Sequence, residues 1–298
     1  MITLLDGGMG MELIKRGVAE VTGFWSAQAL LEAPDTVVEV HKDYIAAGAR
    51  IITTNSYSTI PSYLEKGELA DRFVELTQLA GELARRAVNE SGDPSVRVAG
   101  SIPPLSESYR PDLVPAKDEA QPVYEHMVKA LAANADLFLC ETMSSADEAV
   151  NAVSQAVMYG DNKPVMVSWT LKESPGAGLR SGESITEAFS KLGEYPVEGF
   201  LFNCTQPEAI VVALNELRPL TTKPIGGYPN RFNALQQDWT LDNDVSIGFR
   251  ADLDVDSFVE TAIRFQESGA DIIGGCCGIG PEYIAALVAS SDRIHLDN

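Results

Sequence analysis

Eight short apolar segments, each followed by a stretch with helical spacing, recur from one end of the chain to the other. Most are continuous apolar runs rather than alternating apolar and polar residues, as expected for parallel strands that are buried on both faces. The predicted strands cover residues 2–5, 50–54, 96–100, 137–140, 165–169, 199–203, 224–227 and 271–274. The predicted helices cover residues 35–47, 69–90, 120–133, 145–159, 185–192, 207–217, 255–267 and 281–289.

Eight strand–helix units in 298 residues predict a (β/α)8 TIM barrel, one domain spanning residues 1–298. A doubly wound sheet is the alternative architecture. It is weakened because Asp6-Gly7-Gly8-Met9-Gly10, after the first strand, lacks the spacing of a dinucleotide-binding loop. Two long predicted loops, 101–117 and 228–249, follow the third and seventh strands, and loops of this length are usually functional.

The active site of such a barrel lies at the carboxyl ends of its strands. The residues at these ends are Asp6, Asn55, Ser101, Glu141, Trp169, Cys204, Tyr228, Cys276 and Cys277. Cys204 ends the sixth strand, and the glycine-framed pair Cys276–Cys277 follows the eighth, so all three thiols converge beside the seventh. Three thiolates without a fourth protein ligand are typical of a zinc site with an open position. Cys140 lies within an apolar strand and is interpreted as a small buried hydrophobic residue.

Two acids, Asp6 and Glu141, also stand at strand ends, and we expect them to hold a cationic group such as an α-ammonium. The amides of Gly7 and Gly8 are expected to receive a carboxylate. Together these groups would fit an amino acid that carries a thiol. The alternatives for each acid are a helix cap or a solvated charge.

Two further residues are expected in the substrate pocket. Asn55 stands at the end of the second strand, and Trp25 lies in the first long connection. The face of Trp25 suits a methylated cation, and simple packing is its alternative role.

The composition excludes several classes of protein. A net charge of −21 argues against nucleic-acid binding, which requires clustered Lys and Arg; the acidic surface could steer cationic ligands or simply aid solubility. There is no run of eighteen apolar residues and no signal-peptide pattern at the start, so we expect no membrane association. Four cysteines and no secretion signal favour the reducing cytoplasm.

With these residues in hand, the chain resembles the homocysteine S-methyltransferase family over nearly all its length. The resemblance is carried by Leu5-Asp6-Gly7-Gly8-Met9-Gly10, Phe24-Trp25-Ser26, Ile52-Thr53-Thr54-Asn55, Glu141-Thr142-Met143, Asn203-Cys204, Tyr228-Pro229-Asn230 and Gly275-Cys276-Cys277-Gly278. It implies that Cys204, Cys276 and Cys277 bind zinc and that Asp6 and Glu141 hold the substrate amino group.

The chain departs from the family pattern at Arg231-Phe232 and at Ile102-Pro103-Pro104-Leu105, which border the presumed donor side. The C-terminal arm through which betaine-type relatives form tetramers has no counterpart here, so a monomer or weak dimer is expected.

The resemblance implies zinc-dependent transfer of a methyl group from a sulfonium or ammonium donor to homocysteine, giving methionine. The donor that the resemblance favours is S-methylmethionine. No catalytic residue beyond the metal site is expected, because the metal keeps the thiol deprotonated. Two alternatives use the same cysteines. One is a non-catalytic zinc-binding or thiol redox-sensing barrel. The other is a zinc hydrolase, which the all-cysteine ligand set disfavours.

Overall fold

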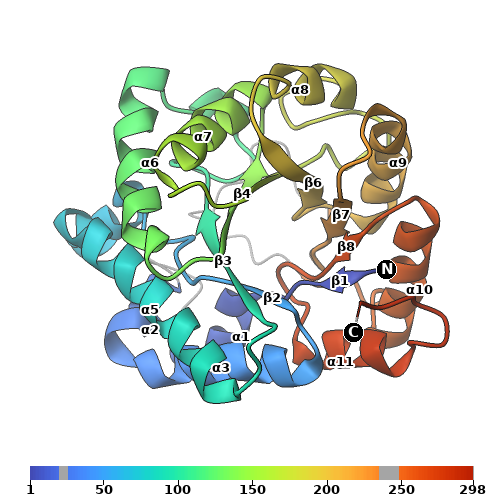
Figure 1. Ribbon diagram of the computed structural model, residues 1–298, viewed down its shortest axis with the longest axis horizontal. Helices are drawn as coiled ribbons and strands as arrows, with labels where there is room; N and C mark the ends of the chain where they lie inside the picture. The colour runs from blue at the N-terminus through green and yellow to red at the C-terminus, as the bar shows by residue number, and fades with distance from the viewer. Residues whose placement is uncertain (20–25, 235–247, 298) are drawn as a thin grey trace.

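The computed structural model describes residues 1–19, 26–234 and 248–297. Over these ranges, eight strands form one parallel sheet in the order β1-β8-β7-β6-β5-β4-β3-β2 (Figure 1). Leu5 also bridges Ile51 in parallel, which joins the end of β1 to β2 and closes the sheet into a barrel. The strands are Thr3–Leu4 (β1), Ile51–Thr53 (β2), Arg97–Ile102 (β3), Leu137–Met143 (β4), Val165–Trp169 (β5), Val197–Asn203 (β6), Ile225–Tyr228 (β7) and Ile272–Ile273 (β8).

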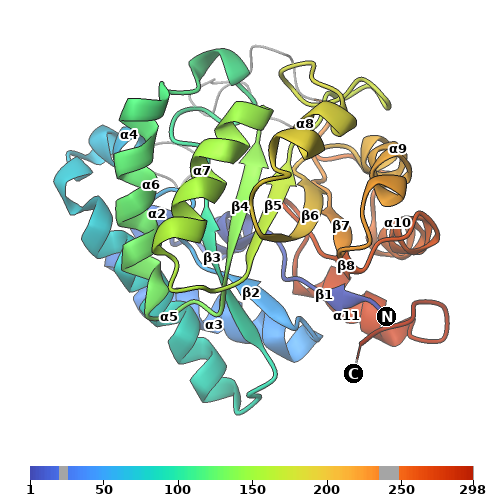
Figure 2. The ribbon, with the colours of Figure 1, turned by 45° about the horizontal axis from the view of Figure 1, so that its top comes forward.

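The helices form a layer around the outside of the strands (Figures 1 and 2). The two chain ends lie side by side, since Ile2 bridges Leu296 in parallel. The helices are Met9–Lys15 (α1), Ala27–Glu32 (α2), Pro34–Ala47 (α3), Pro61–Leu64 (α4), Phe73–Ser91 (α5), Lys117–Ala132 (α6), Ala146–Tyr159 (α7), Ile185–Lys191 (α8), Pro207–Leu217 (α9), Val255–Glu267 (α10) and Pro281–Ala289 (α11). The single-chain TIM barrel predicted from the strand–helix alternation is confirmed.

The two faces of the strands build two separate cores. Side chains that point inward, among them Leu5, Leu139 and Leu201, pack in the barrel interior. Side chains that point outward pack against the helices, and Trp169 is one of these, stacked on Phe200 at a centroid distance of 6.0 Å. Trp169 therefore faces the helix layer and not the barrel mouth, although it stands at a strand end.

Several predicted boundaries are wrong at the strand ends that carry the site. β3 continues to Ile102 and β4 to Met143, so Ser101 and Glu141 belong to strands rather than to loops. The loop after β3 therefore covers residues 103–116, and Pro111–Leu113 forms a 3₁₀ turn within it. Of the second long loop, residues 235–247 lie outside the described ranges. The hydropathy pattern predicts these strands to end too early because their last residues are polar. The hydrogen bonds that such residues make to neighbouring strands do not appear in a hydropathy pattern.

Capping residues set the ends of the helices. Ser145 caps α7 by accepting a hydrogen bond from the amide of Glu148, and Gly48 ends α3 in the left-handed conformation with φ +109°. The short helices α1 and α2 were not predicted, since each has too few residues for a clear 3.6-residue period. Among the described helices, none has both the length and the apolar character needed to cross a bilayer.

Candidate metal centre and substrate site

Three cysteine sulfurs meet at the mouth of the barrel. The Sγ atoms of Cys204, Cys276 and Cys277 all lie within 4.8 Å of one another, and those of Cys204 and Cys276 are 2.8 Å apart. The convergence predicted from the strand count is thereby confirmed; metal binding itself stays a prediction. Cys140 is fully buried in the outer core, where burial raises the pKa of its thiol, and it is not part of the cluster.

The last residue of β7 and the residue after it hold the two cysteine-bearing segments together. The amide of Cys204 donates to the carbonyl of Tyr228 at 3.2 Å, and the amide of Cys276 donates to the carbonyl of Pro229 at 2.9 Å. Cys204 adopts a left-handed φ of +53°, which turns its backbone out of the strand direction. Hydrogen bonds from the thiols of Cys276 and Cys277 hold the pKa of Cys204 well below its usual range. The backbone therefore brings the three thiols together, and the cluster favours a thiolate at Cys204.

The glycines after β1 allow this loop to lie directly against the cysteine pair. A Cβ on Gly8 would lie 2.7 Å from the carbonyl oxygen of Cys276, and a Cβ on Gly7 would lie 2.2 Å from that of Ile279. The amide of Gly8 donates to the carbonyl of Ile279 at 3.0 Å. The amide of Gly8 is thus paired within the chain, and the expectation that Gly7 and Gly8 receive a substrate carboxylate stays a prediction.

Asp6 is a buried acid held by the neighbouring strand. Its carboxylate accepts hydrogen bonds from the amide of Thr53 at 2.7 Å and from the hydroxyl of Thr53 at 3.1 Å. Burial raises the pKa of Asp6 to about 8, against the lowering effect of the Thr53 bonds, and the charge of Glu141 adds to the rise. A cation placed beside Asp6 would reverse this shift.

Glu141, near the end of β4, is a second buried acid. Its carboxylate accepts hydrogen bonds from the hydroxyl of Ser101 and, at 3.2 Å, from the hydroxyl of Tyr228. Burial raises the pKa of Glu141 to about 7 in spite of these two donors. Two buried carboxyls with raised pKa values, set in a barrel mouth, form a site suited to a cationic group.

Asn203 links the acid-bearing strand to the cysteine-bearing strand. Its Oδ1 accepts from the amide of Thr142 at 2.9 Å and from the hydroxyl of Ser168 at 2.7 Å, and its Nδ2 donates to the hydroxyl of Thr142 at 2.8 Å. Thr142 has a left-handed φ of +61° directly after Glu141. The side chain of Asn203, the residue before Cys204, thus fixes the strained position that adjoins Glu141.

Of the remaining two predicted pocket residues, Asn55 lies within the described part of the chain. Asn55 is buried and donates to the carbonyl of Ser26 at 3.0 Å, which anchors the start of α2. Trp25, the residue before Ser26, lies outside the described residues. Asn55 therefore fixes Ser26 at the start of α2, and the role of Trp25 stays a prediction.

Tyr109 is a site residue that sequence reasoning missed. It comes from the loop between β3 and α6, and its hydroxyl lies 2.8 Å from the Sγ of Cys204. The Nδ2 of Asn230 lies 3.8 Å from the same sulfur. The length of the loop signalled a functional segment, but no spacing rule distinguishes Tyr109 from the other residues of that loop.

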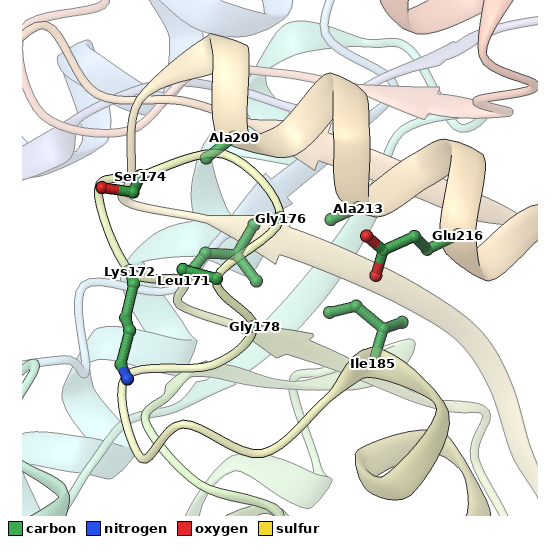
Figure 3. A pocket seen from close by; sticks show the side chains of 10 residues that line it. Leu171, Lys172, Ser174, Gly176, Gly178, Ile185, Ala209, Ala213 and Glu216 are labelled. Atoms are coloured by element: carbon green, nitrogen blue, oxygen red, sulfur yellow. The ribbon is translucent and has the colours of Figure 1, made fainter.

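A separate small cavity lies between the loop after β5 and the helices α8 and α9. Apolar side chains, including Leu171, Ile185 and Ala213, line its inside, while Lys172 extends away from it (Figure 3). Of the predicted site residues that the structure describes, none borders this cavity. It is therefore distinct from the cysteine cluster.

Comparison with known proteins places this arrangement in a family. Residues 3–290 match the family described as homocysteine S-methyltransferase. Homocysteine S-methyltransferase of Escherichia coli is 31% identical, with 97% of this chain and 95% of that protein covered. Homocysteine S-methyltransferase YbgG of Bacillus subtilis is 30% identical, with 97% and 94% covered. The crystal structure of the E. coli homocysteine methyltransferase MmuM in its metallated form superposes with a TM-score of 0.81 at 30% identity, covering 97% of this chain and 96% of that one. With the match extending over nearly the whole barrel, this chain belongs to the homocysteine S-methyltransferase family.

Proposed function

We propose that this protein transfers a methyl group from a sulfonium donor, S-methylmethionine, to the sulfur of homocysteine, and that residues 1–298 form one homocysteine-binding barrel domain. The observation that carries the proposal is the meeting of the three thiols with two buried acids at one barrel mouth. The family supports the reaction class, since its named members are homocysteine S-methyltransferases.

The donor set of the cluster fits zinc. Three sulfur ligands within 4.8 Å of one another match a tetrahedral site that leaves one position for a substrate atom. Cys204, Cys276 and Cys277 would hold the ion. When bound, zinc would lower the pKa of the substrate thiol and hold its sulfur at the open position.

The two acids orient the amino acid. An ammonium group between Asp6 and Glu141 would stabilise the charged forms of two carboxyls that burial otherwise disfavours. Ser101 and Tyr228 hold Glu141, and Thr53 holds Asp6, so both acids are fixed before the substrate arrives. Fixed anchors of this kind favour in-line attack by reducing the entropy lost in the transition state.

The donor side is lined by aromatic residues. Phe232 packs beside Cys204, Cys276 and Cys277, and its ring stacks on Phe249 at a centroid distance of 5.5 Å. An aromatic face attracts a sulfonium cation. On transfer, the bond from the methyl carbon to the donor sulfur breaks, and its electron pair stays on that sulfur, so the positive charge vanishes while a new carbon–sulfur bond forms. Phe232 and Trp25 are the side chains that we assign to the donor.

The test is an assay of zinc-loaded protein with homocysteine labelled in its carbon skeleton and S-methylmethionine as donor, with S-adenosylmethionine and betaine tested in parallel. Because the demethylated donor is itself methionine, the product that counts is methionine carrying the homocysteine label, and mass spectrometry should detect it with S-methylmethionine. Cys140→Ala is the matched control for Cys204→Ala, and only the latter should abolish the product. If no donor yields labelled methionine and oxidation instead forms a reversible Cys204–Cys276 disulfide, the redox-sensing alternative would take its place.

A further inference from the structure

We propose that Tyr109 is a positioning residue of the metal centre, whose hydroxyl donates a hydrogen bond to the sulfur of Cys204 and so makes this ligand different from the other two. The inference rests on the metal site of the proposed function. It concerns a residue from the loop after β3, a segment that departs from the family pattern at its start.

The contacts around the cluster are asymmetric. The hydroxyl of Tyr109 lies 2.8 Å from the Sγ of Cys204, and the Nδ2 of Asn230 lies 3.8 Å from it. Over the described ranges, neither Cys276 nor Cys277 receives a hydrogen bond from a side-chain oxygen or nitrogen. Among the residues that the structure describes, the polar side-chain contacts of the cluster therefore concentrate on Cys204.

Tyr109 is held in place with a strained backbone conformation. It is buried, and it has a left-handed φ of +69°, a conformation that a bulky residue rarely adopts. The guanidinium of Arg180 lies 5.0 Å from the centre of its ring. The preceding residue, Ser108, shares a 2.7 Å hydrogen bond with the hydroxyl of Tyr57. Backbone strain that surrounding contacts maintain is typical of a functional residue whose side chain must stay in one position.

The chemical consequence follows from charge. Three thiolates on a divalent cation leave a net negative site, and a hydrogen bond to one of them withdraws electron density from that sulfur. Groups that hold a metal ligand in this way fix its orientation, and their removal typically costs about 10- to 100-fold in metal affinity. Loss of the bond should also raise the energy of the sulfur lone pairs and move sulfur-to-metal charge-transfer absorption to longer wavelength.

The experiment compares full-length wild-type protein with Tyr109→Phe, each loaded with Co²⁺ for spectroscopy and titrated against a chelator for Zn²⁺ affinity. Tyr124→Phe, which removes a buried phenol in the outer core, is the matched control. We expect Tyr109→Phe to bind Zn²⁺ about 10- to 100-fold more weakly and to show a red-shifted charge-transfer band, and Tyr124→Phe to match the wild type. Tyr109→Leu, which also lacks the donor and adds no metal ligand, replaces Tyr109→Phe if the latter does not fold.

Failure of the proposed function can be distinguished from failure of the role proposed for Tyr109. A wild-type protein without sulfur-to-cobalt absorption would overturn the metal site and the proposed function. A wild-type protein with that absorption, together with unchanged affinity and band position in Tyr109→Phe, would overturn the role of Tyr109 alone.

Discussion

At the scale of single residues, the site depends on side chains whose ionisation the barrel controls. Removing one sulfur from the cluster leaves two protein ligands, one fewer than an open zinc site uses. We expect Cys204→Ala, Cys276→Ala and Cys277→Ala each to lose most of the one zinc per chain predicted for the wild type, and Cys140→Ala to keep it. Metal analysis of purified protein measures this, and a full zinc content in Cys204→Ala would exclude that residue as a ligand.

The two acids should act on substrate binding and not on the metal. Asp6→Asn and Glu141→Gln each remove one charge-assisted hydrogen bond to an ammonium, worth about 1.5–3 kcal/mol, so the KM for homocysteine should rise roughly 10- to 100-fold. Zinc content should stay unchanged. Ser95→Ala, at an exposed position outside the site, is the control. Unchanged KM values in both acid variants would mean that the amino group is bound elsewhere.

The raised pKa values of these acids also predict a pH dependence. In the ligand-free protein the pKa of Glu141 is about 7 and that of Asp6 about 8, so both are largely protonated at pH 6 and cannot attract an ammonium fully. Homocysteine affinity should therefore increase as the pH rises from 6 through 8. Calorimetric titration of the zinc-loaded protein measures this slope, and it should become shallower in Asp6→Asn. An equal slope in the variant would show that Asp6 does not titrate in the binding process.

At the scale of elements, β4 and β6 are joined across β5 by Asn203. Asn203→Ala would leave the amide of Thr142 and the hydroxyl of Ser168 without their acceptor in a buried site, at a cost of roughly 2–5 kcal/mol in the free energy of unfolding. Because the left-handed positions at Thr142 and Cys204 both adjoin these bonds, the same variant should weaken zinc binding and raise the KM for homocysteine. Urea unfolding with chelator competition tests both, and Asn215→Ala on the exposed face of α9 is the control. A stability loss without any change in metal affinity would contradict the link between the strands.

At the scale of the whole molecule, the net charge of −21 governs how copies of the barrel meet. Like charge on every copy opposes association, and salt screens this repulsion. We expect a monomer or weak dimer at micromolar concentration in low salt, with any dimer favoured by added salt. Light scattering coupled to size-exclusion chromatography checks this; a stable tetramer at low salt would contradict it.

The sequence by itself determined the architecture and the identity of the metal-type cysteines. Continuous apolar runs are a local signal of strands buried on both faces, and parallel strands in a barrel necessarily bring their carboxyl ends to one rim. The positions of Cys204, Cys276 and Cys277 at those ends were therefore sufficient to predict that they meet, as the structure confirms. The same argument placed Asp6 and Glu141 at the mouth.

Only the tertiary structure decided which groups surround these residues. Tyr109 reaches Cys204 from a loop whose path is set by packing, Thr53 and Ser101 become partners of the acids through strand pairing, and the Gly8 amide is taken by Ile279. Trp169 stands at a strand end yet faces the helices, because one residue of register reverses the direction of a side chain. Hydrogen-bond partners and side-chain directions depend on contacts between segments distant in the chain, and no local pattern carries that information.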